Sequence, residues 1–200
     1  MDDHVIHLLF SANRWEAAKT IASLLAAGTT VLCDRYYHSG IVYSAAKRNP
    51  ALSLAWARHP EVGLPRPDLV LFLDLDEEQA RARGGWGGEV YEKGEMQRRV
   101  RDLFWGLSLG KIGVSAPRAE ESGPQQQQPP GSGDSVALGA VTAETPVLAE
   151  VRFRQEEEDL HVVDASVSVE EVAEEVWKVV RPRVEAVERG EVGKAVRRVV

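Results

Sequence analysis

The 200-residue sequence contains one cysteine, Cys33. A single cysteine excludes an internal disulfide, and because Cys33 falls in a predicted strand we expect a buried, inert thiol in a reducing compartment. No apolar run approaches the roughly 20 residues needed to cross a bilayer. Asp2 and Asp3 stand where a signal peptide would be basic. We therefore expect a soluble protein without a membrane partner, located in the cytoplasm, with the nucleus as a second location.

Basic residues are fewer than acidic residues in this sequence. Lys and Arg total 24 against 31 Asp and Glu, which gives a formal net charge of −7. Proteins that bind nucleic-acid backbones usually present a basic face, so we expect no nucleic-acid partner. Hydrophobic residues make up 44% of the chain, which suffices for one sizeable core.

Helical and strand patterns alternate along the chain. Short apolar runs predict strands at residues 30–33, 69–75 and 161–163, and the 3.6-residue period predicts helices at 7–27, 39–47, 52–58, 77–83 and 94–107. Ser168 and Glu171 form a capping-box pair that opens a last helix, which Pro182 should kink or end. This order predicts an α/β fold with a parallel sheet. Asp34, Asp74 and Asp164 follow the strands and should gather at one edge.

Residues 112–158 differ in composition, with a run of four glutamines followed by Pro, Gly and Ser. Such a segment cannot bury enough apolar surface to fold, so we expect a mostly disordered insertion rather than a functional module. The predicted organisation is a first domain part at 1–111, the insertion at 112–158, a last strand and helix at 159–182, and a basic tail at 183–200. For the tail, a solvated helix or frayed end is favoured over an RNA-binding arm.

The pair Asp34 and Arg35 directly follows the first predicted strand. A carboxylate at this position could orient Mg²⁺, and a guanidinium could hold a phosphate through two parallel hydrogen bonds. A simple ion pair that closes the strand is an equally good interpretation of these residues alone.

Five segments decide between these interpretations. They read HLLFSANRWE at 7–16, VLCDRY at 31–36 with SGIVY at 39–43, GLPRPDLVLFL at 63–73, GGEVYE at 87–92 and VVDAS at 162–166. In this order and spacing the set resembles the thymidylate kinase family, most closely its eukaryotic type. The resemblance implies a P-loop-kinase-like, three-layer α/β fold and phosphoryl transfer from Mg²⁺-bound ATP to dTMP, which yields dTDP and ADP.

The resemblance also implies site residues. Asp34, Arg35 and Arg83 would take part in catalysis, with Asp34 orienting Mg²⁺. Asp164, Ala165 and Ser166 would border the adenine of ATP. The residues expected to bind dTMP are Phe10, Arg14, Arg35, Gly40, Tyr43, Tyr91 and Gln97. For Arg83, a simple helix-ending role remains equally open.

The family's phosphate-binding loop should read Gly, four residues, then Gly-Lys-Ser or Gly-Lys-Thr. Gly-Lys occurs only before Ile112 and before Ala195, so we expect this chain to lack the family's first strand and P-loop and to bind ATP poorly. Val90 also stands where the eukaryotic lid usually has arginine. The family further implies a homodimer packed through helices, and the helix at residues 5–25 is the candidate for this interface.

Two other functions compete with the kinase. One is a non-catalytic nucleotide-binding or dimerising relative that keeps only the dTMP pocket. The other is a hydrolase, because residues 106–110 match Gly-x-Ser-x-Gly around Ser108. That nucleophile elbow requires a strand before the serine, whereas a helix is predicted there, so we expect the match to be coincidental.

Overall fold

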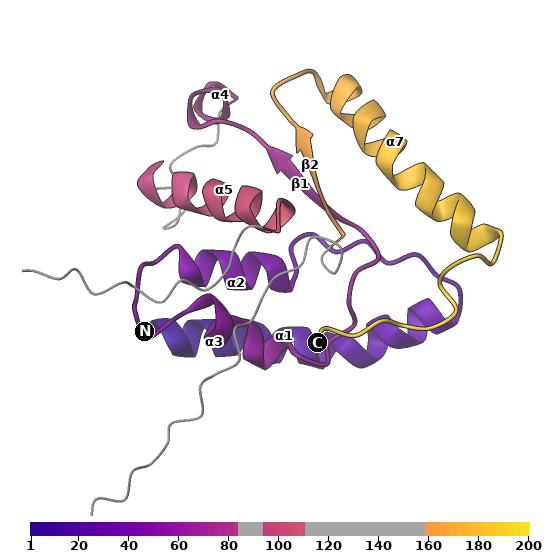
Figure 1. Ribbon diagram of the computed structural model, residues 1–200, viewed down its shortest axis with the longest axis horizontal. Helices are drawn as coiled ribbons and strands as arrows, with labels where there is room; N and C mark the ends of the chain where they lie inside the picture. Colours follow the sequence, from indigo (N-terminus) through magenta and orange to yellow (C-terminus); the bar gives the residue numbers. More distant parts are fainter. Residues whose placement is uncertain (84–93, 111–158) are drawn as a thin grey trace, which may run out of the picture.

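The structure is a computed structural model that describes residues 1–83, 94–110 and 159–200 (Figure 1). Within these ranges, helical segments precede, separate and follow two strands. In chain order the elements are α1 (Asp3–Ala26), α2 (Tyr37–Ala45), α3 (Leu54–Arg58), the 3₁₀ helix η1 (His59–Glu61), β1 (Val70–Asp74), α4 (Glu77–Ala82), α5 (Gly94–Ser108), β2 (Leu160–Asp164) and α7 (Val169–Glu188).

The two strands β1 and β2 form a parallel pair, which confirms two of the three predicted strands. Their register pairs Val70 with Leu160 and Asp74 with Asp164. The two aspartates therefore lie side by side at the carboxyl end of the pair, where ligands bind in open α/β sheets. The backbone N–H of Ala165 extends the pairing, donating to the carbonyl of Asp74 at 2.8 Å.

Helices cover both faces of this small sheet. On one face, the rings of Phe72 in β1 and Phe104 in α5 stack with their centroids 4.4 Å apart. On the other face, α7 packs on β2. Because alternate strand residues point to opposite faces, the apolar runs of both strands can serve both helices. The result is a three-layer α/β arrangement.

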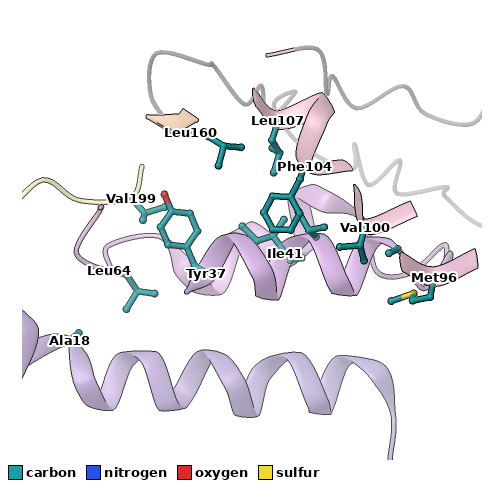
Figure 2. Packing of buried hydrophobic residues seen from close by; sticks show 13 residues of the cluster. Ala18, Tyr37, Ile41, Leu64, Met96, Val100, Phe104, Leu107, Leu160 and Val199 are labelled. Carbon is teal, nitrogen blue, oxygen red and sulfur yellow. The ribbon is translucent and has the colours of Figure 1, made fainter. Parts of the chain in front are cut away.

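The core extends from the sheet into a stack of helices. Figure 2 shows α2 between α1 and α5, with Tyr37 and Ile41 directed toward side chains of other elements. Both of these side chains are almost completely buried. Burial of this kind is the main favourable contribution to folding. The core cluster comprises Ala18, Tyr37, Ile41, Val42, Ala46, Ala57, Leu64, Met96, Val100, Phe104, Leu107, Leu160 and Val199.

The strand predicted at residues 30–33 is wrong. These residues have no regular secondary structure, Leu32 is 96% exposed, and Cys33 is exposed rather than buried. In the described part of the chain, no strand lies beside them to accept their backbone hydrogen bonds. A β-propensity run forms a strand only when a neighbour completes its ladder, so Asp34 does not join Asp74 and Asp164 at a strand end.

The helix caps follow the sequence closely. Ser168 and Glu171 form the predicted capping box, and the side chain of Asp76 accepts a hydrogen bond from the N–H of Gln79 at 2.8 Å. Each satisfies backbone donors that a helix N-terminus leaves unpaired. None of the helices in the described ranges is long and apolar enough to cross a membrane.

Pro182 was expected to kink or end the last helix, and the second outcome is wrong, because α7 continues to Glu188. Proline removes one backbone hydrogen bond, the one to the carbonyl of residue 178, and the ion pair between Arg181 and Glu185, at 2.6 Å, supports the turn that follows. The boundary proposed at 182 therefore falls inside a helix.

The end of the chain is not frayed either. Val199 is buried and exchanges backbone hydrogen bonds with Gly63 and Leu64 at 2.8 and 3.0 Å. Arg197 also donates to Asp159 at 2.7 Å. Residues 112–158 lie outside the described residues.

Phe104 joins the helical stack to the sheet, which generates a stability prediction. Phe104→Ala should lower the free energy of unfolding by about 3–5 kcal/mol, since it removes a buried ring and leaves a cavity. Leu109→Ala is the matched control, because Leu109 lies just after the same helix and is 49% exposed. It should change stability by less than about 1 kcal/mol. Urea unfolding of both variants measures the difference, and equal losses would contradict the assigned core.

Candidate functional site: two arginines on one face of α2

Helix α2 presents Gly40 and Tyr43 to the residues expected to bind a nucleotide. Residues three apart on a helix are neighbours on its surface. The helix is held in place by its buried residues Tyr37, Ile41 and Val42. A ligand site built on this face therefore rests on rigid backbone.

Arg14 of α1 lies directly against Gly40. A Cβ atom built at Gly40 would lie 2.8 Å from Nη2 of Arg14 and 3.1 Å from its Nη1. No real Cβ tolerates such an approach, so the missing side chain at Gly40 makes room for the guanidinium. Gly40, expected to lie at the dTMP site, thus admits the side chain of Arg14, which is also expected to bind the nucleotide.

Arg35 lies over the second residue of this face. Its guanidinium carbon is 5.5 Å from the centroid of the Tyr43 ring, within the range of a cation–π contact. The backbone of Arg35 has φ of 63°, a left-handed conformation that is uncommon for a residue with a side chain. Because Gly40 and Tyr43 are one helical turn apart, the guanidinium groups of Arg14 and Arg35 lie against neighbouring positions on one face of α2.

The other residues expected to bind dTMP are Phe10, Gln97 and Tyr91. Phe10 lies one turn before Arg14 on α1, with 60% of its surface exposed. Gln97 lies in α5, half-buried. Tyr91 and Val90 lie outside the described residues. So does the glycine-rich flap at 84–88, which is expected to act as the family's lid. Phe10 and Gln97 belong to the two helices that pack against α2, α1 and α5.

The metal prediction finds limited geometric support. Asp34 is exposed beside Arg35. Within residues 1–83, 94–110 and 159–200, no three side chains of His, Cys, Asp or Glu form a metal-binding group. Mg²⁺ commonly takes one or two carboxylates and completes its shell with water and substrate phosphates. Asp34 therefore fits as one ligand, or as an acceptor for the ion's waters, and not as part of a protein cage.

A buried pair beneath Arg14 was not expected from the sequence. The carboxylate of Glu61 accepts hydrogen bonds from Nε of Arg14, at 2.8 Å, and from its Nη2. His7 lies on the other side, with Nε2 3.5 Å from Oε1 of Glu61 and Nδ1 2.8 Å from the hydroxyl of Ser44. The side chains of His7 and Glu61 are both 0% exposed. A charged residue at the end of a Pro-containing turn gave no sign of this burial.

Burial lowers the pKa of His7 below its ordinary value of 6.5, against the opposing influence of the Glu61 carboxylate. The positive charge of Arg14 acts in the same direction as burial. Taking a cation out of water is unfavourable, so the neutral imidazole is the stable form here. Glu61 therefore has one permanently cationic neighbour, Arg14.

The loop after β2 connects with the segment that leads to the predicted lid. Arg83 donates from Nη2 to the carbonyl oxygens of Ala165 and Val167, at 2.6 and 2.9 Å. Asp164 accepts a hydrogen bond from the N–H of Ser166 at 2.8 Å. Hydrogen bonds from Ser166 lower the pKa of the Asp164 carboxyl. Arg83 thus ends α4 and also fixes the loop expected to border adenine.

A cleft of about 430 Å³ opens at the carboxyl ends of β1 and β2. Arg101 forms a bidentate pair with Asp74 there, at 2.6 and 2.7 Å, and the pair raises the pKa of the Arg101 guanidinium. The lining residues are Asp74, Leu75, Asp76, Gln79, Arg101, Trp105, Val162, Asp164 and Ser166. Two residues of the predicted adenine loop, Asp164 and Ser166, therefore face this cleft. Arg14 and Arg35, which lie against α2, are not among its lining residues.

The hydrolase alternative fails on geometry. Ser108 is the last residue of α5, is buried, and donates its hydroxyl hydrogen to the carbonyl of Trp105 at 2.9 Å. A nucleophile elbow needs a strand before the serine and an exposed hydroxyl. Ser108 has neither.

The model of the family described as thymidylate kinase matches residues 1–111, more than half of the chain. The chain belongs to the thymidylate kinase family. All the residues of the α2 site lie in the matched part.

Individual thymidylate kinases agree with this assignment. The human enzyme is 49% identical over 104 residues, which cover 52% of this chain and 48% of the relative. The enzyme of Schizosaccharomyces pombe is 52% identical over the same shares of both chains. For the enzyme of Arabidopsis thaliana the identity is 49%, over 38% of the relative. The chain thus spans about half or less of these curated relatives.

A solved structure supports the fold. The thymidylate kinase of Candida albicans aligns with a TM-score of 0.66 at 24% identity, covering 100% of this chain and 74% of that one. A P-loop-kinase-like α/β fold is therefore confirmed.

The lowered pKa of His7 predicts a pH dependence of stability. Below pH 6.5 the unfolded chain takes up a proton at His7 that the folded chain does not, so the free energy of unfolding should fall as the pH falls through this region. His7→Gln should reduce this slope between pH 7 and 5. His161→Gln, at an exposed histidine of β2, is the control. Denaturant unfolding across the pH range measures both slopes, and an unchanged slope in His7→Gln would contradict the assignment.

Proposed function

We propose that this chain binds dTMP on the face of α2 and presents it as the acceptor of a phosphoryl group from Mg²⁺-bound ATP, giving dTDP and ADP. The observation that carries the proposal is the placement of Arg14 against Gly40 and of Arg35 over Tyr43, two neighbouring positions on one face of α2. Family membership gives this arrangement its chemical meaning. The whole relatives act as thymidylate kinases, and this chain supplies the half in which their acceptor would lie.

Arg35 would hold the monophosphate. A guanidinium binds phosphate oxygens through parallel, charge-assisted hydrogen bonds. The adjacent helix supports the same role, because α2 begins at Tyr37 and the N-cap residue Tyr36 makes no side-chain cap bond. The N-terminus of a helix favours an anion. Asp34, next in sequence, would then orient Mg²⁺ or its waters at the reacting phosphate.

Arg14 and the aromatic residues would recognise the base. Arginine only donates hydrogen bonds, and the O4 atom of thymine only accepts them. Tyr43 lies beside this position on α2, and Phe10 lies one turn away on α1. A ring stacked on the thymine would bury apolar surface and fix the plane of the base.

The donor side would use the loop after β2. Asp164, Ala165 and Ser166 would border the adenine, and Arg83 would keep this loop beside the predicted lid through its two carbonyl contacts. Mg²⁺ and ATP would supply charge neutralisation and the transferred group. The chain's own residues would orient the acceptor phosphate and exclude water around it.

Isothermal titrations of dTMP and of Mg²⁺-bound ATP, each alone, test the function together with a turnover assay. Binding of both with formation of dTDP supports the kinase. Binding of dTMP alone supports the second candidate, a non-catalytic or dimerising relative that keeps the acceptor pocket. Loss of dTMP binding would contradict both.

Arg35→Ala should weaken dTMP binding about 10- to 100-fold, the effect of losing charge-assisted hydrogen bonds to phosphate. Arg48→Ala is a matched control, because Arg48 also has a left-handed backbone, with φ of 56°, and its side chain is 71% exposed. The two variants therefore share any backbone strain. Equal dTMP affinities in the two variants would contradict the phosphate role of Arg35.

We further propose a homodimer in the cytoplasm, formed through α1. This helix exposes Val5, Leu8, Leu9 and Leu24, and exposed apolar surface of this extent is typical of an interaction face. Leu9→Glu should shift the protein toward monomer in sedimentation or light scattering. Val169→Glu, at an exposed position of α7, should leave the oligomeric state unchanged. A monomeric parent protein would refute the dimer.

A further inference from the structure

Glu61 occupies an unusual position for a carboxylate. It ends η1 with its side chain 0% exposed, and its oxygens face Arg14 on one side and His7 on the other. A buried carboxylate is strongly unfavourable unless it is paired and hydrogen-bonded. Because His7 is uncharged in its stable form, the guanidinium of Arg14 is what neutralises Glu61.

The geometry of this pair constrains Arg14 in detail. Two nitrogens, Nε and Nη2, donate to the two oxygens of Glu61. A planar guanidinium held at two points cannot rotate about its long axis. The third nitrogen, Nη1, lies against Gly40 and donates no hydrogen bond to any other described residue. The Arg14 side chain keeps 11% of its surface exposed.

Two further contacts hold the residue before Glu61. Ser11 and Trp15 of α1 both donate to the carbonyl of Pro60, at 3.2 and 2.6 Å. These bonds flank Arg14 along α1 and tie η1 to the same helix. The carboxylate therefore cannot follow Arg14 if the arginine moves.

We propose that Glu61 is a positioning residue for base recognition: it holds Arg14 at two nitrogens so that Nη1 stays directed at the edge of the acceptor base. This inference rests on the proposed binding of dTMP at the α2 site. His7 packs on the other side of Glu61 and adds no positive charge that would compete with Arg14 for the carboxylate.

The consequence is discrimination between pyrimidines. Thymine presents an O4 acceptor where cytosine presents an N4 donor. A fixed donor at Arg14 bonds the first and opposes the second. An arginine free to swing away would avoid the unfavourable contact with cytosine, so loss of Glu61 should reduce selectivity more than it reduces phosphate binding.

The test measures the affinities of the full chain for dTMP and dCMP by isothermal titration. Glu61→Gln keeps the side-chain size but removes the charge pair, and it should lower the dTMP-to-dCMP affinity ratio about tenfold, in keeping with one charge-assisted hydrogen bond. Ser23→Ala is the control: it also removes a side-chain hydrogen bond of α1, to the carbonyl of Lys19 at 2.9 Å, yet it contacts neither η1 nor Arg14. Its affinity ratio should equal that of the parent.

A double-mutant cycle separates positioning from a general structural effect. In an Arg14→Ala background, Glu61→Gln should cause no further change in the ratio, because the group that it positions is gone. If Glu61→Gln does not fold, Glu61→Asp replaces it, since the shorter carboxylate keeps the charge but withdraws the guanidinium. The same fall in ratio is expected.

The outcomes are distinguishable. A parent protein that binds dTMP, together with a folded Glu61 variant that keeps the parental ratio, would overturn the positioning role and leave the proposed function intact. An equal effect of Glu61→Gln with and without Arg14 would also overturn it. A parent that binds no dTMP would overturn both.

Discussion

The burial of α2 between α1 and α5 is the constraint on which the rest of the structure depends. Tyr37, Ile41 and Val42 are almost fully buried along this helix, and α1 and α5 pack on its two sides. This packing fixes the rotation of α2 and therefore decides that Gly40 and Tyr43 face Arg14 and Arg35. Buried side chains that are not expected to contact a ligand therefore determine which residues form the site.

The two arginines of the site differ in their electrostatic surroundings. The site gathers two permanent cations, and within the described ranges Arg14 has a buried counter-charge, in Glu61. Arg35 lies instead over the Tyr43 ring. One arginine is thus bound firmly by the protein, which suits orientation of a neutral base. The other carries the charge and the two-pronged donor geometry that suit a phosphate.

Much of the fold could be predicted from local sequence signals. Caps at Asp76 and Ser168, the helical periods and the strand at Val70–Asp74 depend on nearby residues, and each is confirmed. Residues 31–33 carry the same apolar signal without a neighbouring strand, so propensity misled there. Pairing across long sequence distances, as between Glu61 and Arg14, leaves no local pattern. The family motifs therefore indicated Arg14 and Arg35, whereas the carboxylate that holds Arg14 required coordinates.

The irregular path of the chain before α2 has a practical consequence. Cys33 is exposed there, it is the one thiol in the sequence, and it lies two residues from Arg35. Desolvation raises its pKa, so the reactive thiolate forms at more alkaline pH than for a free cysteine. A fluorophore attached through maleimide chemistry under mildly alkaline conditions would carry its signal at a single, known place, two residues from the arginine proposed to hold the phosphate.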